Sequence, residues 1–341
     1  MKTLFHLPLL AVLSLASCAY DAPADQGAHR AAFSFIVIGD TPYSDADEQM
    51  LAQAVPVIRD GAYPFIIHVG DYKGGRQPCI ERYDERFAAL VDSLAPTPVF
   101  YTPGDNEWTD CDRDDIAKSG FERASELERL DLIRNRFFSS PQANADTLRY
   151  ERQPEQVENA TWAYGEVRFA TIHVVGTANG RDYVGLDDSA TAGAAADDRD
   201  RRNLDWLTRA AALAKSEKAR ALIIAMQADP TDLDGKRLGE ACEGASARSR
   251  ACDAFAGYRA RLKSLAEDFS KPVLLIHGDT APFTLNRKMA GDETEYLWRL
   301  NAAGDAGVGY GVRDVTLVTI DADSETPFSA IALLSGRAPD E

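Results

Sequence analysis

Four short apolar runs in this chain each lead into a Gly-Asp step. The runs are Phe33 to Ile38, Phe65 to Val69, Val99 to Tyr101 and Val273 to His277, and they lead into Gly39-Asp40, Gly70-Asp71, Gly104-Asp105 and Gly278-Asp279. Short apolar runs bounded by turn residues are typical of strands buried on both faces of a parallel or mixed sheet. Such strands deliver the residues beyond their carboxyl ends to one edge. The pattern therefore predicts four carboxylates at one edge of a sheet.

Carboxylates that are brought together without partners repel one another and raise one another's pKa values. A metal cation is the usual means of holding several ionised carboxylates in one place, so these four aspartates are candidate ligands of a divalent metal. Two further steps, Gly291-Asp292 and Gly304-Asp305, follow no apolar run. We expect those two to be ordinary surface turns.

The first residues have the pattern of an export signal. Lys2 precedes an apolar stretch from Leu4 to Leu15, which is short for a membrane span and ends in Leu15-Ala16-Ser17-Cys18. This ending resembles the bacterial lipoprotein signal, in which the cysteine, here Cys18, is lipidated and becomes the mature N-terminus. By the same resemblance, Ala19 implies sorting to the outer membrane. An ordinary cleaved signal peptide is the alternative.

The export signal sets the expected domain organisation. We expect a signal peptide at residues 1–17, a lipid-anchored tether at 18–30, and one α/β domain at 31–341, in which no linker-like break occurs. The formal net charge is -17 at pH 7. An acidic surface attracts neither nucleic acid nor anionic lipid. We therefore expect no nucleic-acid partner, membrane contact through the lipid anchor only, and a location in the outer membrane or periplasm.

Export also changes the interpretation of the other cysteines. Cys79, Cys111, Cys242 and Cys252 are even in number, which favours two disulfides in an oxidising compartment. Of the possible pairings we favour Cys79 with Cys111, because each lies a few residues beyond a Gly-Asp step. The other two flank a single loop, which favours pairing Cys242 with Cys252. A zinc site with thiolate ligands is the rival interpretation, but the CxxC spacing is missing.

Helical and strand patterns alternate along the rest of the chain. We expect helices over 45–60, 80–94, 121–138, 203–215 and 252–269, and further strands over 161–164, 167–175, 221–226, 315–320 and 328–334. Pro56 is expected to kink or shorten the first helix. Helices follow the early strands and hairpins appear later. This order suggests a sheet-on-sheet core with helices outside.

The ordered Gly-Asp series resembles the calcineurin-like metallophosphoesterases, whose motifs run GDxH, GDxxx, GNHE, a strand ending in His, and GHxH. The matching segments are Gly39-Asp40-Thr41-Pro42, Gly70-Asp71-Tyr72-Lys73, Gly104-Asp105-Asn106-Glu107, Met226-Gln227 and Gly278-Asp279-Thr280-Ala281. They occur in the family order over most of the chain. The resemblance implies a four-layer α/β/β/α fold with a two-metal site at the carboxyl ends of its strands, and it implies phosphoester hydrolysis.

This chain lacks nearly every histidine of the family pattern. By the resemblance, Asp71 would bridge two metals and Asp105 stands in place of a metal-binding Asn. Asn106 stands in place of the His that stabilises the phosphate or protonates the leaving group. Gln227 and Asp279 replace metal-binding histidines with oxygen donors.

The expected ligand set, Asp40, Asp71, Asp105, Gln227 and Asp279, is therefore rich in oxygen. Pro42 and Ala281 offer no side-chain ligand at all. Oxygen donors suit Mn²⁺, Mg²⁺ or Ca²⁺ better than Zn²⁺, so we expect one or two divalent ions of that kind.

Three residues near the motifs are further candidates. His277 immediately precedes Gly278-Asp279, where it could act as a general acid or ligand, or support the site through hydrogen bonds. Lys73 and Arg76 follow the second Gly-Asp step, where a cation could meet a phosphate oxygen of the substrate. A solvated loop is the alternative for these two.

The sequence thus predicts an exported, metal-dependent phosphoester hydrolase that acts on a phosphorylated small molecule, with a metal-activated water as the attacking group. The alternative is a non-catalytic, metal-stabilised surface lipoprotein that keeps the fold for binding. The number of ligands that converge near Asp71 distinguishes the two.

Overall fold

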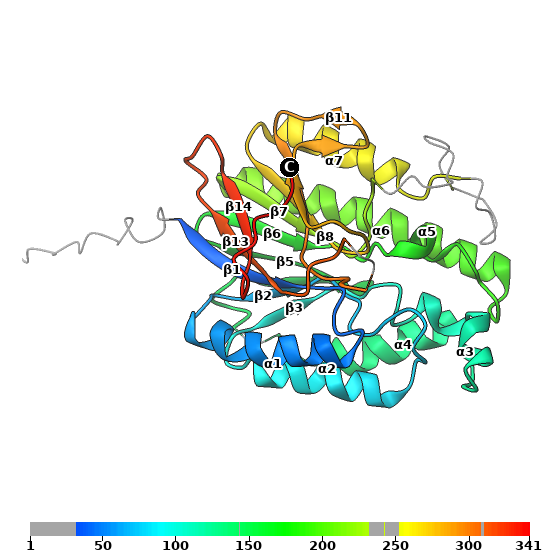
Figure 1. Cartoon of the computed structure of the whole chain (residues 1–341). Coiled ribbons are helices and arrows are strands. Elements are labelled where there is room, and N and C mark those ends of the chain that lie inside the picture. Colours follow the sequence, from blue (N-terminus) through cyan, green and yellow to red (C-terminus); the bar gives the residue numbers. More distant parts are fainter. Residues whose placement is uncertain (1–31, 143, 232–241, 243–251, 308–309) are drawn as a thin grey trace, which may run out of the picture.

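The computed structural model describes residues 32–142, 144–231, 242, 252–307 and 310–341 (Figure 1). The expected signal peptide, Cys18 and the tether lie outside the described residues. Among the described helices, none has both the length and the apolar character that crossing a bilayer requires.

The strands form two large sheets. The first contains, in spatial order, β14 (Phe328–Ala332), β13 (Thr316–Ile320), β1 (Phe33–Ile38), β2 (Ile66–His68) and β3 (Val99–Tyr101). The second contains β4 (Glu151–Gln153), β5 (Gln156–Tyr164), β6 (Val167–Thr171), β7 (Ala221–Ala225), β8 (Val273–His277), β12 (Leu297–Asn301) and β9 (Thr284–Asn286). Strands β1, β2 and β3 are parallel to one another, and so are β6, β7, β8 and β12. A small hairpin of β10 (Lys288–Met289) and β11 (Asp292–Glu293) forms a separate two-stranded sheet.

Helices cover the outer face of each sheet. The α-helices are α1 (Asp45–Asp60), α2 (Glu81–Ser93), α3 (Asp114–Lys118), α4 (Glu126–Phe137), α5 (Gly176–Gly180), α6 (Ser189–Ser216) and α7 (Ala256–Phe269), with a short 3-10 helix η1 (Thr109–Asp112). Figure 1 shows α1 and α2 beside the first sheet and α6 and α7 on the side of the second. The four-layer α/β/β/α fold expected from the sequence is therefore confirmed.

Alternation along each strand sorts the side chains between layers. In β1, Phe35 and Val37 point into the core between the sheets, where they join Trp162 and Phe169, whereas Ile36 and Ile38 point outward onto α1. In β8, Leu274 and Ile276 enter the same inter-sheet core. This alternation sends His277, the last residue of β8, toward the outer face.

Several element boundaries differ from the sequence expectation. Helix α1 runs past Pro56 to Asp60, so that proline does not shorten it. Helix α4 begins at Glu126, where the Ser125 side chain accepts a hydrogen bond from the Glu128 N–H. Helix α6 begins at Ser189, fourteen residues before the expected start at Asn203, because the charged stretch between them is helical and partly buried.

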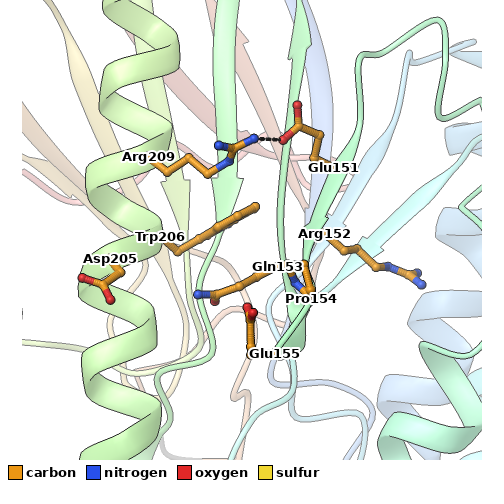
Figure 2. A pocket seen from close by; sticks show the side chains of 8 residues that line it. All are labelled: Glu151, Arg152, Gln153, Pro154, Glu155, Asp205, Trp206 and Arg209. Atoms are coloured by element: carbon orange, nitrogen blue, oxygen red, sulfur yellow. Dashed lines mark hydrogen bonds and ion pairs between the residues drawn. The ribbon is translucent and has the colours of Figure 1, made fainter.

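The edge of the second sheet carries a cavity of about 640 Å³ between α6 and β4. Figure 2 shows that Trp206 and Arg209 of α6 face Glu151 and Gln153 across it, and Arg209 pairs with Glu151. The indole N–H of Trp206 donates to the carbonyl of Ala160. No strand-end aspartate lines this cavity, so it is separate from the site described next.

Candidate functional site

The Gly-Asp steps form tight turns at the ends of parallel strands. Asp40, Asp71 and Asp279 have left-handed backbones, with φ of 52°, 61° and 70°. Aspartate tolerates this conformation better than most residues because its short side chain bonds to nearby backbone. The turn after β3 requires glycine at position 104, because a Cβ there would lie 2.0 Å from Oδ1 of Asp71. The repeated Gly-Asp steps are therefore explained by the backbone conformation and close packing of these turns.

A single amide brings the expected carboxylates together. The Gln227 Nε2 donates to Asp71 Oδ2 at 3.2 Å, to Asp105 Oδ1 at 3.0 Å and to Asp279 Oδ1 at 3.1 Å. The backbone N–H of Asp279 donates to Asp40 Oδ1 at 2.8 Å. The four aspartates, which we call the strand-end cluster, therefore lie together between the ends of the two sheets.

Gln227 itself holds the cluster by donating hydrogen bonds. Its Oε1 accepts the N–H of Gly176 at 2.6 Å, and this contact fixes which end of the amide faces the carboxylates. In this arrangement Gln227 presents nitrogen to the carboxylates, and not the ligand oxygen that the family resemblance implies.

The Asp71 side chain accepts hydrogen bonds at both of its oxygens. Its Oδ2 accepts from Asn106 Nδ2 at 2.8 Å and from the Tyr43 hydroxyl at 3.1 Å, in addition to Gln227. Its Oδ1 accepts the backbone N–H of Asn106 at 3.2 Å. Asn106 thus contacts the cluster as expected, and Tyr43 contacts it without having been expected.

Burial changes the proton affinity of the cluster. Asp40 and Asp71 are 4% and 2% exposed. Burial, followed by the charges of neighbouring carboxylates, raises the pKa of Asp71 well above its usual range. Burial also raises the pKa of Asp40, and Asp305 and Asp105 add to the increase. A bound cation would oppose these shifts by favouring the ionised forms.

The donor set fits a hard divalent cation in its chemistry. Carboxylate oxygens of the cluster come from both sheets and face one another across the Gln227 amide. Their arrangement does not already enclose an ion: within the described residues, no three histidine, cysteine or acidic side chains are grouped so that they could hold one. A cation would therefore have to displace some of the hydrogen bonds that now join these side chains.

Glu107 supports the backbone of two turns that carry the cluster. It accepts the backbone N–H groups of Asp71 and Gly104 and the hydroxyl of Tyr101 at distances of 2.8 to 3.1 Å. With all of these donors around it and no exposed surface, Glu107 fixes the two Gly-Asp turns relative to each other.

The disulfides expected from the sequence are present. Cys79 is joined to Cys111, and Cys242 to Cys252. Sγ of Cys111 lies 3.3 Å from the carbonyl of Glu107, so the first disulfide braces the loop that carries the third Gly-Asp step.

His277 belongs to a separate buried group. Its Nε2 accepts from Arg299 Nη1 at 3.0 Å and lies 3.8 Å from Asp229, and its Nδ1 lies 2.8 Å from the carbonyl of Gly278. Burial lowers the pKa of His277 to about 4. These contacts favour the supporting role over those of ligand or general acid.

Lys73 and Arg76 differ in their surroundings. Lys73 is fully buried and donates to the carbonyls of Gly74 and Gln77, and burial lowers its pKa to about 8. Arg76 is exposed and lines a cavity of about 460 Å³ together with Arg113 and Tyr183. Only Arg76 of the two is placed to meet a ligand from solvent.

The expectation that Gly304-Asp305 is an ordinary surface turn is wrong. The Asp305 N–H donates to the carbonyl of Asp40, and a Cβ on Gly304 would lie 2.5 Å from the carbonyl of Gly39. Burial raises the pKa of Asp305 to about 6. Gly291-Asp292, by contrast, forms the exposed turn of the β10–β11 hairpin, as expected.

Sequence reasoning missed the turn that follows β6. Thr177, Ala178 and Asn179 have consecutive left-handed backbones, with φ of 53°, 52° and 55°. This conformation costs about 1–2 kcal/mol for each residue that is not glycine. The Thr177 hydroxyl lies 2.7 Å from Asp105 Oδ2 and accepts from Arg113 at 2.9 Å. The Gly-Thr-Ala-Asn-Gly sequence directly after the apolar residues Val174 and Val175 was the available signal.

The chain was compared with protein families, curated proteins and solved structures. No protein-family model matches the chain, and no curated protein sequence matches it. The solved structure of PhoD is similar, with 12% identity and a TM-score of 0.52 over 90% of this chain and 68% of PhoD. A dimetal phosphatase from Danio rerio has 14% identity and a TM-score of 0.46 over 84% of this chain and 95% of that one. GAP50, the anchor in the inner membrane complex of Plasmodium, has 11% identity and a TM-score of 0.46 over 90% and 86% of the two chains. At this low identity, the likeness to PhoD shows a shared fold.

Proposed function

We propose that the strand-end cluster binds one or two divalent cations and hydrolyses phosphoesters of small molecules. The observation that carries the proposal is the meeting of four strand-end carboxylates, from both sheets, around the Gln227 amide. Their mutual repulsion and burial favour a cation as the stabilising partner.

The carboxylates of Asp40, Asp71, Asp105 and Asp279 would hold the cation. Because these ligands are oxygens, Mn²⁺, Mg²⁺ or Ca²⁺ is preferred to Zn²⁺. Such an ion supplies Lewis-acid stabilisation of phosphoryl oxygens when bound.

Arginines near the cluster would bind the phosphate of the substrate. Arg113 is joined to Asp105 through the Thr177 hydroxyl, and with Arg76 it lines the 460 Å³ cavity. Guanidinium groups are suited to phosphate because they offer paired N–H donors. No strand-end aspartate lines this cavity, and its link to the cluster runs through Arg113, which lines it and bonds to Thr177.

We further propose that the protein is exported and anchored by a lipid on Cys18. The two disulfides support an oxidising compartment.

Cation binding and turnover test the function together. We expect calorimetry to detect Mn²⁺ or Mg²⁺ binding, and an aryl phosphate to be hydrolysed only when the cation is present. Asp71→Ala should abolish both, whereas Asp292→Ala, in the exposed Gly-Asp turn, should change neither. Stoichiometric Zn²⁺ in protein purified without added metal would contradict the metal preference.

One observation favours the non-catalytic alternative. Asp71, the expected bridging ligand, already accepts four hydrogen bonds from the protein. If the wild type binds a cation but shows no turnover with any metal, while Asn106→His with Ala281→His gains activity, the alternative is correct.

A further inference from the structure

The amide nitrogen of Gln227 lies at the point where a cation would join three carboxylates of the strand-end cluster. This nitrogen is 3.0 to 3.2 Å from one oxygen each of Asp71, Asp105 and Asp279. Divalent cations contact oxygen ligands at about 2.0 to 2.6 Å, so an ion shared by these three oxygens would overlap the nitrogen. The amide group therefore takes the place of one cation.

The contacts of Gln227 keep its amide in that place. The residue is fully buried, and its Oε1 accepts the N–H of Gly176 at 2.6 Å. Its backbone is held as well, because its N–H donates to Val174 at 3.2 Å and its carbonyl accepts from Gly278 at 3.0 Å. A cation that enters the cluster must therefore bind beside the amide and not in its place.

The amide leaves negative charge uncompensated on the side of Asp40. Gln227 is neutral and has two protons to share among three carboxylate oxygens. The buried Lys73 and Arg113 supply positive charge on the side of Asp110. The strongest charges that act on Asp40 are, by contrast, those of other carboxylates. A cation is therefore needed most beside Asp40.

Asp305 adds a carboxylate on this side of the cluster. Its N–H donates to the carbonyl of Asp40 at 2.9 Å, and a Cβ on Gly304 would lie 2.9 Å from the Cβ of Asp40, so this segment passes directly over Asp40. The charge of Asp305 acts on Asp40 and on the Tyr43 hydroxyl. That hydroxyl lies 3.4 Å from Asp40 Oδ1 and 3.1 Å from Asp71 Oδ2. Oxygen donors of three aspartates thus lie near one point.

From this geometry we infer that the strand-end cluster binds a single divalent cation, on the Asp40 side of the Gln227 amide, with Asp305 as an additional ligand. The inference rests on the proposed function and narrows its one or two cations to one. Gln227 is a positioning residue in this arrangement, because it holds carboxylates of the cluster without contacting the cation.

The number of bound ions is the first test, and it does not depend on a variant. Calorimetric titration of the wild type with Mn²⁺ should give one ion per chain. Electron paramagnetic resonance of the saturated protein should show isolated Mn²⁺ without magnetic coupling to a second ion. Two ions per chain with a coupled signal would overturn the inference and leave the proposed function intact. No binding of Mn²⁺, Mg²⁺ or Ca²⁺ would refute both.

Gln227→Glu tests whether the amide excludes the second ion. Glutamate has nearly the same shape, but its ionised form donates no hydrogen bond and offers oxygen on both arms. This variant should bind two Mn²⁺ ions per chain. Gln53→Glu is the matched control, because it adds the same charge at an exposed position of α1, and it should bind one ion. One ion per chain in Gln227→Glu would contradict the role given to the amide.

Asp305→Asn tests the additional ligand. The Mn²⁺ affinity of this variant should fall by at least about tenfold, with one ion still bound per chain. Asp292→Asn is the matched control, since Asp292 lies in the exposed turn of the β10–β11 hairpin, and its Mn²⁺ affinity should equal that of the wild type. Wild-type affinity in Asp305→Asn would overturn the assignment of Asp305 as a ligand.

Discussion

Gly176→Ala probes the packing of two carboxylates of the cluster against the turn after β6. A Cβ at this position would lie 2.4 Å from Oδ1 of Asp279 and 2.5 Å from Oδ2 of Asp105. The backbone of Gly176 is not left-handed, so alanine can adopt its conformation. The added methyl group therefore acts by contact with the two carboxylates.

The size of the effect follows from these distances. To reach ordinary van der Waals contact at 3.4 Å, each carboxylate oxygen must retreat by about 1 Å, which exceeds the roughly 0.2 Å tolerance of a metal–ligand distance. We expect divalent-cation affinity to fall by about 10- to 100-fold. Forcing a methyl group into a packed region should also cost about 1–3 kcal/mol of unfolding free energy, which lowers Tm by several degrees.

Calorimetric titration with Mn²⁺ and thermal unfolding of the cation-free protein measure the two effects separately. The control is Gly257→Ala, because Gly257 lies in α7 and a Cβ there would have no atom within 4 Å. That variant should bind Mn²⁺ as the wild type does and gain up to about 1 kcal/mol from its helix propensity. If Gly176→Ala binds Mn²⁺ with wild-type affinity, the strand-end cluster is not where the cation sits.

Two further predictions concern buried groups outside the cluster. Burial raises the pKa of Glu126 to about 10, so the folded protein keeps a proton that the unfolded chain releases above about pH 4.5, and stability falls as pH rises through that interval. The free energy of unfolding of Glu126→Gln, measured with urea, should therefore rise relative to that of the wild type by up to about 1.4 kcal/mol per pH unit between pH 5 and pH 8. Equal pH dependence of the two free energies would contradict the assignment. His277→Gln should lower Tm but change kcat by less than about tenfold, because the ring contacts Arg299 and is fully buried; a loss of 100-fold or more would make it the proton donor after all.

The strand ends could be predicted because their signal is local. Each run before a Gly-Asp step is short and apolar, and parallel strands necessarily bring their carboxyl ends to one edge. Asp40, Asp71 and Asp105 therefore lie at one edge of the first sheet as expected, whereas Asp279 follows β8 of the second sheet and meets them between the two sheets. The first disulfide followed from the same reasoning, because the loops after neighbouring strands are neighbours.

The step at Gly304-Asp305 was misjudged because the strand before it does not look buried. β12 contains Arg299 and Asn301, which interrupt its apolar pattern. In the structure Arg299 contacts His277, and Asn301 donates to the carbonyls of Thr280 and Pro282. Buried polar groups that find partners far away in the sequence leave no local signal of burial.

The length of α6 was underestimated for a related reason. The Asp- and Arg-rich stretch before Asn203 lacks an apolar pattern, but Arg199 is 4% exposed and lies over the ring of Trp108. Thr177 was missed because its significance depends on Asp105 and Arg113, which are more than sixty residues away. Only the folded chain brings such partners together.

The orientation of Gln227 connects the cluster to the turn after β6. An amide oxygen could face a cation only if the Gln227 side chain rotated, and rotation would break the hydrogen bond from the Gly176 N–H, at a cost of about 1 kcal/mol. That N–H immediately precedes Thr177, so a rotation would also release one of the contacts that hold the left-handed turn. The amide is therefore better suited to spacing the carboxylates than to ligation. The nitrogen of Gln227 donates to the acidic side chains, while its oxygen anchors the turn after β6 through the Gly176 N–H.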